Sequence, residues 1–408
     1  MSNLSPAEQA LRGSDIEGAL GYADQAQSCG PSGEALGNLY GLRLAAHFWR
    51  DRWTEAFPAG TEALRLLQPG STGWCRAAAI MAPITPLLGR DAEFAALAQT
   101  LAQVEPSAEA RPAYVHAAAY VMVMLSLTGQ VGPARAFQKL VQKQGAALLT
   151  QDLALVGIIL FAETVFERML GRDPYRAWQL STEGAAASER AADPRNLLFI
   201  KAFEGIGLAD LGDHAGAWAV LQSAAGLATR LREPLLQAHV RIHIEQLQLV
   251  RGSAADTEAT YSSARQSVEE AGINPLLRGQ SLINLARAQR LRGEPEAALA
   301  TGRKAAGLLA GTPAHLIYLG ATLIDCLLAL GCTAEAADEA RAGLQRRAQL
   351  GSGGYGEVEF LRAAAAALAA AGQLEDAARV RLEVQEQITL RAERIPDPQV
   401  RARYLAHA

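Results

Sequence analysis

The hydrophobic pattern of the chain is helical and is interrupted by glycine at regular distances. Apolar residues recur three or four positions apart in stretches such as Ser281 to Ala305, which is the spacing of an amphipathic helix. Glycines stand between such stretches at intervals of 38 to 42 residues, at Gly89, Gly129, Gly171, Gly212, Gly252, Gly293, Gly331 and Gly372. Weaker junctions near Gly13 and at Arg50-Asp51 continue this spacing toward the N-terminus. The chain therefore contains an internal repeat.

Two further columns of residues keep register with these glycines. Prolines lie 17 or 18 residues before a repeat glycine, where a proline can open a helix because its missing N–H has no helical partner there: Pro112, Pro194, Pro234, Pro275 and Pro313. Alanines lie five residues after a repeat glycine, where a small side chain lets the second helix cross close to the first: Ala134, Ala217, Ala298, Ala336 and Ala377. Each unit is predicted to be a helix, a short turn and a second helix.

These columns predict an all-α fold, a right-handed α-solenoid of about ten helical hairpins with a period near 40 residues and no β-sheet. We expect one superhelical domain over residues 1–408, with hairpin junctions near residues 13, 51, 89, 129, 171, 212, 252, 293, 331 and 372. Composition agrees with this prediction. Half of the residues are apolar but only 6% are aromatic, and alanine runs such as Ala363 to Ala367 favour helix.

Segments Ser281 to Ala305 and Ala321 to Leu344 resemble tetratricopeptide repeats. Both carry a small and a large residue at the helix contact, the turn glycine, and the alanine that follows it. The period exceeds the standard one of about 34 residues. Such lengthened repeats are similar to the sensor region of bacterial maltose-regulon-activator-like signalling ATPases and to the C-terminal regions of related ATPase-linked kinases. The closing segment ERIPDPQVRARYLAHA also resembles the end of those regions.

Charge and hydropathy argue against several classes of partner. The formal net charge is −4, so no positive field attracts phosphate backbones or anionic lipid, and we expect no nucleic-acid partner. The longest apolar stretch, Leu153 to Ala162, is about half of the ~20 residues that a membrane span needs. The opening segment MSNLSPAEQA lacks the basic and apolar parts of a leader. We expect a cytoplasmic protein without a membrane partner.

Candidate chemistry is sparse. The four cysteines are scattered without a C-x-x-C pair, which predicts neither a disulfide framework nor a cysteine zinc site. His239 and His243 share a helix face, but no third ligand is near, and we interpret them as polar residues of a solvated or groove-lining face. The sequence lacks a Walker-type phosphate loop and a nucleophile elbow. We therefore expect no cofactor, no metal site and no enzymatic activity.

The segment QLGSGGYGEV, Gln349 to Val358, matches the glycine-rich loop that covers ATP in protein kinases. A kinase also needs flanking strands, a lysine after the loop and metal-binding motifs, but the last lysine, Lys304, precedes the segment. Gly354 lies 18 residues before Gly372, in the slot that proline fills in other repeats. The segment is therefore predicted to be a flexible connection between hairpins. An anion cradle at the following helix N-terminus is the alternative.

The first helices of a tetratricopeptide solenoid line its concave side, and a partner is expected there. Residues 13 and 6 positions before each repeat glycine share one face of these helices. This stripe is apolar at Ile158, Val165, Phe199 and Ile206 and then becomes polar, at His239, Gln246, Gln280, Arg287, Tyr318 and Asp325. We interpret the six polar residues as a solvent-facing, partner-binding surface; solvation without a partner is the alternative.

The leading hypothesis for function is a non-catalytic scaffold that binds a segment of a partner protein on the concave surface, in bacterial signalling or regulation. One alternative is a sensor that binds a small inducer and controls an ATPase, kinase or transcription module. A second alternative is a structural subunit of an enzyme complex. If the concave surface is exposed, replacing Arg287 and Tyr318 together should change stability by no more than about 0.5 kcal/mol.

Overall fold

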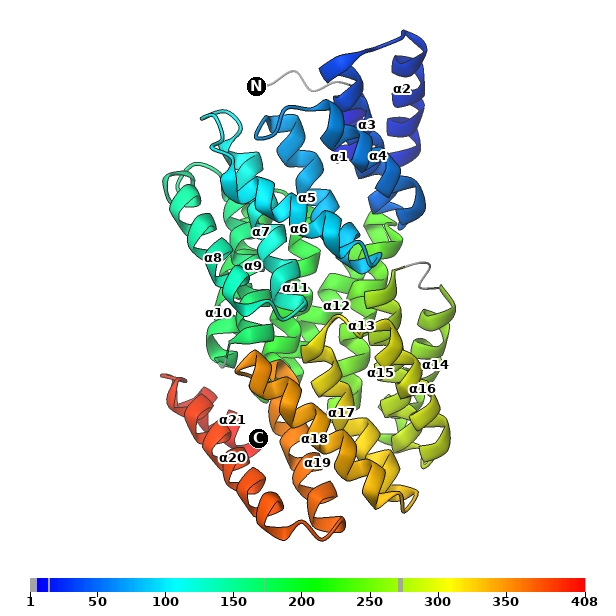
Figure 1. The fold of residues 1–408 in the computed structure, drawn as a ribbon, viewed down its shortest axis with the longest axis vertical. Coiled ribbons are helices and arrows are strands. Elements are labelled where there is room, and N and C mark those ends of the chain that lie inside the picture. The colour runs from blue at the N-terminus through cyan, green and yellow to red at the C-terminus, as the bar shows by residue number, and fades with distance from the viewer. Residues whose placement is uncertain (1–5, 14, 172, 271–273, 408) are drawn as a thin grey trace.

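The computed structural model of the chain describes residues 6–13, 15–171, 173–270 and 274–407. These residues form twenty-one α-helices and two short 3-10 helices, and they contain no β-strand. Helices α1 to α20 pair in chain order into ten hairpins, and α21 follows them (Figure 1). The predicted all-α solenoid of helical hairpins is confirmed. Residues 1–5 of the opening segment lie outside the described residues.

Each hairpin consists of a first and a second helix. The first helices are α1 (Pro6–Arg12), α3 (Gly33–Trp49), α5 (Thr72–Leu87), α7 (Arg111–Leu127), α9 (Leu153–Leu170), α11 (Pro194–Asp210), α13 (Pro234–Arg251), α15 (Pro275–Leu291), α17 (Pro313–Ala329) and α19 (Glu357–Ala370). The second helices are α2 (Ile16–Ser28), α4 (Trp53–Leu66), α6 (Asp91–Gln103), α8 (Val131–Gly145), α10 (Pro174–Arg190), α12 (His214–Leu231), α14 (Ala254–Glu270), α16 (Pro295–Leu308), α18 (Thr333–Leu350) and α20 (Leu374–Glu393). The remaining elements are η1 (Ala146–Leu148), η2 (Gly354–Gly356) and α21 (Pro398–His407).

The turn inside most hairpins has left-handed backbone at the repeat glycine. The φ angle lies between 68° and 80° at Gly89, Gly129, Gly212, Gly252, Gly293, Gly331 and Gly372. This region favours glycine, which has no Cβ atom to clash there. Asp51 adopts the same region, at 56°, in the turn between α3 and α4. Gly171 differs, because its φ of −78° and ψ of 177° are extended backbone that any residue adopts.

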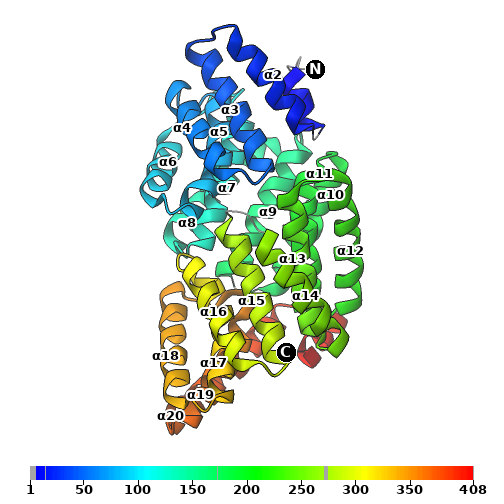
Figure 2. The same ribbon diagram turned by 90° about the vertical axis from the view of Figure 1, so that its right-hand side faces the viewer.

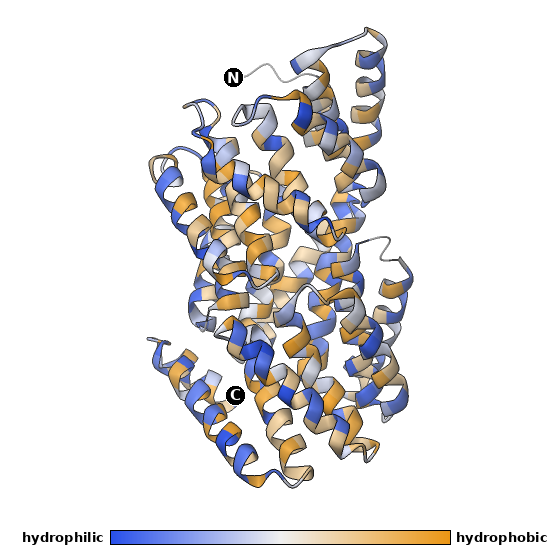
Figure 3. Ribbon diagram, in the orientation of Figure 1, coloured by the Kyte–Doolittle hydropathy of each residue, from blue (hydrophilic) through white to orange (hydrophobic). Residues whose placement is uncertain are grey.

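The proline and alanine columns lie where the pattern places them. Four of the five prolines are the first residue of a first helix, α11, α13, α15 or α17, and Pro112 is the second residue of α7. The five alanines are fully buried in second helices, so the two helices of those hairpins approach closely. Hydrophobic residues are densest on central first helices such as α7 and α9, while α20 at the edge is mostly hydrophilic (Figure 3).

The hairpins stack into an elongated superhelix, with α1 to α4 at one end and α19 and α20 at the other (Figures 1 and 2). Consecutive first helices pack side by side, from α3 and α5 to α17 and α19. The superhelix is tightly wound. A Cβ atom built on Gly129, between α7 and α8, would lie 2.6 Å from Leu350 Cδ2 and 2.7 Å from Pro313 Cγ. Its successive turns are therefore in direct contact.

The expectation of a flexible loop at Gly351 to Val358 is wrong. Ser352, Gly353, Gly354 and Gly356 are buried, although they connect α18 to α19. Because the superhelix is tightly wound, this connection crosses its interior and packs against the end of α9. The Ser352 hydroxyl donates a hydrogen bond to the Gly171 carbonyl oxygen at 3.1 Å, and the Gly354 N–H donates to Ser352 Oγ at 3.1 Å.

No helix among the described residues combines the length and the apolar character that crossing a bilayer requires.

Candidate functional site

A continuous row of rings forms part of the concave side. The ring centroids are 6.2 Å apart for Tyr120 and Phe161, 5.9 Å for Phe161 and Phe199, and 4.7 Å for Phe199 and His239. Phe203 lies 5.7 Å from Phe161 and 5.7 Å from His239, which widens the row. The row links α7, α9, α11 and α13 through edge and tilted ring contacts.

The sequence analysis did not predict this row. His243 also joins the row, with its ring 5.4 Å from that of Phe203. Tyr120, Phe161, Phe203 and His243 recur at 40 to 42 residues, nine or ten positions before a repeat glycine. Because neighbouring first helices lie side by side, residues one repeat apart come into contact. An aromatic column at the repeat period was therefore the signal that could have revealed it.

The concave side is open in its N-terminal half. A groove of about 1260 Å³ is lined by α1, α2 and α3 and by α5, α7, α9 and α11. Its lining is mainly aliphatic and aromatic, with a few polar groups: Tyr22, Leu39, Leu42, Trp49, Ile80, His116, Tyr120, Ile158, Asn196 and Phe199. Ile158 and Phe199, from the apolar part of the predicted stripe, line this groove, whereas Val165 and Ile206 are buried outside it. We call this space the N-terminal groove.

Polar groups on the floor of the N-terminal groove are neutral. Burial lowers the pKa of His116 to about 4 and raises the pKa of Tyr120 above its usual value, so neither ring carries a charge at neutral pH. Asn196 is 6% exposed, and its Nδ2 donates to Ser188 Oγ at 2.7 Å. Its Oδ1 is buried without a hydrogen-bond partner in the part of the chain that the structure describes. An unused acceptor therefore lies in a mainly apolar groove.

A cationic bridge ties α3 to α11 beside the N-terminal groove. The Arg195 guanidinium lies 4.7 Å from the centroid of the Trp49 ring, a cation–π contact. The same guanidinium donates three hydrogen bonds to the carboxylate of Glu233, two from Nε and one from Nη2, which lies 2.5 Å from Oε1. The bridge joins helices that are four hairpins apart in the array and fixes one wall of the groove relative to the other.

The polar end of the predicted stripe is mostly buried, which corrects the expectation of a solvent-facing surface. Four of its residues are 5% to 8% exposed: His239, Gln246, Arg287 and Tyr318. The other two, Gln280 and Asp325, are half-buried. The physical reason is again the tight winding for Tyr318, which Tyr355 of the connection between α18 and α19 covers. His239 is instead buried among the rings of Phe199 and Phe203.

Arg287 and Tyr318 form one unit of this buried surface. The Arg287 guanidinium lies 4.6 Å from the centroid of the Tyr318 ring, and its Nη1 is 2.8 Å from Glu359 Oε1. Asp325 pairs elsewhere, with its Oδ2 3.4 Å from Arg290 Nη1. Burial raises the pKa of the Asp325 carboxyl. The structure therefore joins Arg287 to Tyr318 and leaves Asp325 in a separate ion pair.

The histidines of the stripe pack in the interior, and the expectation of a solvated face is wrong for them. The His239 and His243 rings are 4.8 Å apart, and burial lowers the pKa of His239 to about 4. His243 Nδ1 lies 2.9 Å from Gln246 Oε1, and Gln280 Nε2 lies 2.7 Å from His315 Nε2. Within the described ranges, no three His, Cys, Asp or Glu side chains are grouped so that they could hold a metal ion.

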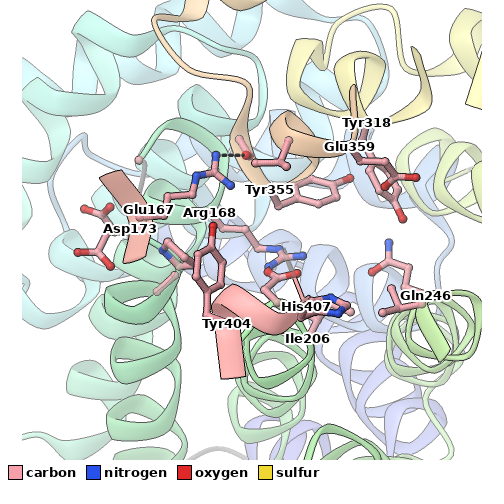
Figure 4. Close-up of a pocket in the computed structure, with 18 of the residues that line it drawn as sticks. Glu167, Arg168, Asp173, Ile206, Gln246, Tyr318, Tyr355, Glu359, Tyr404 and His407 are labelled. Atoms are coloured by element: carbon pink, nitrogen blue, oxygen red, sulfur yellow. Dashed lines mark hydrogen bonds and ion pairs between the residues drawn. The ribbon is translucent and has the colours of Figure 1, made fainter. Parts of the chain in front are cut away.

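A second, smaller cavity of about 190 Å³ lies where two turns of the superhelix meet (Figure 4). Polar and aromatic side chains line it, among them Arg168, Asp210, Gln246, Tyr318, Tyr355, Glu359, Tyr404 and His407. Arg168 pairs with Asp210, and its guanidinium lies 4.6 Å from the centroid of the Tyr355 ring. Small-molecule sites typically measure about 300–1,000 Å³. This cavity is smaller and has room for about six water molecules.

Comparison with known proteins identifies the fold and leaves the family open. No protein-family model and no curated protein sequence matches the chain. Among solved structures, it is similar to a Rap protein complexed with Competence and Sporulation Factor, with a TM-score of 0.59 and 12% identity over 88% of this chain and 99% of that chain. Aspartyl phosphate phosphatase F from Bacillus subtilis gives a TM-score of 0.46 and 15% identity over 88% and 94%. Cut9 of the APC/C hetero-tetramer Cut9-Hcn1 gives 0.41 and 12% over 98% and 82%. The chain has a tetratricopeptide-like fold.

Proposed function

We propose that the chain is a non-catalytic scaffold that binds an extended segment of a partner protein in the N-terminal groove. The groove itself carries the proposal. Its volume of about 1260 Å³ exceeds the range of about 300–1,000 Å³ that is typical of small-molecule sites. Repeat solenoids present elongated concave surfaces of this kind to their partners. A peptide therefore fits this groove better than a small inducer does.

The chemistry of the groove also suits a peptide. Half-buried Leu42, Ile80 and Phe199 offer apolar contacts to side chains of a bound segment. The unused Oδ1 of Asn196 is a buried acceptor, and a backbone N–H of the segment would satisfy it after a rotation of the Asn196 side chain toward the groove. Extended peptides carry free N–H groups at every residue other than proline. Apolar contacts would supply affinity, and the Asn196 hydrogen bond would help to set the register of the segment.

The charges of the groove argue against a nucleic acid as the bound molecule. Acidic and basic side chains are mixed along the lining, at Glu34, Arg76, Glu109, Asp193 and Arg195. A phosphate backbone requires a continuous positive surface, and binding to it depends mainly on lysine and arginine. The mixed signs are compatible with a polypeptide that carries both charges.

Structural similarity supports this proposal at the level of the fold. The similar Rap protein was crystallised with Competence and Sporulation Factor bound. A role in bacterial signalling rests on the resemblance to maltose-regulon-activator-like sensor regions, and a cytoplasmic location rests on the hydropathy of the sequence. Both belong to the proposal. In the sensor alternative, a small inducer would be bound and peptides would not.

A random-peptide library panned against the immobilised full-length chain tests the proposal. Ala26 and Ala35 are exposed residues of α2 and α3 that line the groove, so arginine at either position would obstruct it without disturbing the core. Ala378→Arg on α20 is the matched control, since Ala378 is exposed and lies outside the groove. Selected peptides should bind wild type and Ala378→Arg with equal affinity, and Ala35→Arg should lower their affinity by about tenfold or more. Equal binding to all variants would place the peptide site elsewhere.

A further inference from the structure

The glycine-rich connection between α18 and α19 is held against the end of α9 by contacts between residues far apart in sequence. Ser352 Oγ donates to the Gly171 carbonyl oxygen at 3.1 Å. A Cβ atom built on Gly354, whose φ is +65°, would lie 3.0 Å from the Met169 carbonyl oxygen and 3.3 Å from that of Arg168. Only glycine allows this approach without a shift of the backbone. We call this contact between residues 352–355 and residues 168–171 the clasp.

Tyr355 is the one large side chain that the connection places in the clasp. Its ring centroid lies 4.8 Å from Tyr318 and 5.9 Å from His315, and the Arg168 guanidinium lies 4.6 Å from it on α9 (Figure 4). Arg391 on α20 donates to the Gly354 carbonyl oxygen at 3.2 Å. The clasp therefore consists of polar, aromatic and glycine contacts.

Helix α21 extends the clasp along the same side of the superhelix. Arg403 Nη1 is 3.0 Å from Asp213 Oδ2, at the start of α12. The rings of His407 and His214 are 4.7 Å apart in an edge-to-face arrangement. The C-terminal part, α19 to α21, thus meets α9 to α12 through side chains and turns more than 180 positions away in sequence.

The clasp leaves several buried polar atoms without hydrogen-bond partners among the described residues. They are Arg287 Nε, His315 Nδ1, Gln387 Oε1 and Arg391 Nε, and Arg391 also lines the cavity of about 190 Å³. A buried polar atom without a partner costs free energy that hydration returns. Arg287 and His315 lie on α15 and α17, so an opening that lets water reach these two side chains would remove their part of the penalty.

The packing of α19 against its neighbours in the array is mainly apolar, unlike the clasp. Phe360 and Leu361 are fully buried in the apolar core, and α19 packs directly against α17, α18 and α20. Apolar contacts of this kind have no unpaired polar atoms to solvate. The clasp is thus the weaker of the two interfaces of the C-terminal part, and weak interfaces open first in local unfolding.

We propose that the clasp is a reversible closure of the superhelix, whose opening separates α19 to α21 from α9 to α12 while the hairpins stay folded. Opening exposes Gln246 and the face of Tyr355 that Arg168 covers in the closed molecule. The closed and open forms would then differ in the concave surface they present. This device is independent of the N-terminal groove, which the closed form already presents.

Gly354→Ala and Gly351→Ala form a matched pair that tests the clasp in the full-length chain. Both glycines have positive φ, +65° and +70°, so alanine meets a similar backbone penalty at each. A Cβ atom on Gly354 meets the α9 carbonyl oxygens, whereas one on Gly351 has no heavy atom within 4 Å among the described residues. Hydrogen exchange of the backbone amides and the radius of gyration are then compared between the two variants.

The proposal predicts that Gly354→Ala accelerates exchange by about tenfold in residues 166–171, residues 351–356 and α21, and raises the radius of gyration. In α5 and α7, the exchange rates of Gly354→Ala should equal those of Gly351→Ala. Identical profiles for the two variants, or equal acceleration in every hairpin, would overturn the proposal. If Gly354→Ala does not fold, Ser352→Ala provides the same test, since it removes the hydroxyl that donates to Gly171 and accepts from the Gly354 N–H. Acceleration confined to the same segments supports the clasp, and its absence refutes it.

Discussion

Replacing Arg287 should destabilise the protein strongly, because this residue is part of the interior. Its guanidinium lies 4.6 Å from the Tyr318 centroid and 2.8 Å from Glu359, and the residue is 7% exposed. Arg287→Ala removes a cation–π contact of about 0.5–2 kcal/mol and two buried methylene groups at about 0.8 kcal/mol each. The Glu359 side chain is 44% exposed, so water compensates most of its lost pairing. The free energy of unfolding should fall by about 3 kcal/mol.

Two matched variants separate packing from charge in this prediction. Arg287→Met keeps the methylene groups and removes the unpaired Nε, so it should cost only about 1 kcal/mol. Arg303→Ala removes an arginine whose side chain is 61% exposed, and it should stay within about 0.5 kcal/mol of wild type. Urea unfolding followed by circular dichroism measures all three, with equal m-values as the condition for comparison. If Arg287→Ala behaves like Arg303→Ala, the stripe is exposed and the tightly wound superhelix is wrong.

Two further predictions concern buried side chains. The pKa of His239 is about 4 in the folded protein and near 6.5 in the unfolded chain. Between these pH values only the unfolded chain binds a proton at His239, so acidification lowers the free energy of unfolding by on the order of 3 kcal/mol. His239→Phe should abolish this contribution, so the free energy of unfolding of the variant should fall less steeply than that of wild type from pH 6.5 to pH 4. Equal slopes for the two proteins would contradict the burial of His239. Gly343→Ala should destabilise the protein by about 1–3 kcal/mol, because the new Cβ would lie 2.2 Å from Phe360 Cζ. Gly307 is exposed and has open space around it, so Gly307→Ala should stabilise the protein by about 0.5–1 kcal/mol. Thermal melting of the two glycine variants gives the sign of each change in stability. If both variants melt higher than wild type, or both melt lower, the described packing around Phe360 is wrong.

The fold could be predicted because it is encoded locally. A turn glycine, an opening proline and a small alanine each act within one hairpin, and their repetition gives the helix order without any long-range information. Gly129 and Pro313 illustrate the success: the first has left-handed backbone in a turn, and the second opens α17. The period also indicates which face of each first helix is concave.

The exposure of the concave side could not be predicted in this way. Periodicity defines a helix face, but the pitch of the superhelix depends on small rotations between hairpins that accumulate along the array. Tyr318 and Arg287 are buried because residues 351–356 reach the end of α9, a contact across 181 positions between Ser352 and Gly171. The groove at Ile158 and Phe199 stays open, although the contact between Arg195 and Trp49 joins its two walls. The same stripe therefore has two environments.

Photo-cross-linking of a library-selected peptide to the full-length chain tests the binding site most directly. A peptide that carries a photoreactive group in place of one apolar side chain is irradiated in the complex, and mass spectrometry locates the modified residues. The account predicts cross-links to residues that line the N-terminal groove, such as Trp49, Ile80 and Phe199. Cross-links confined to second helices, such as α12 and α14, would contradict it.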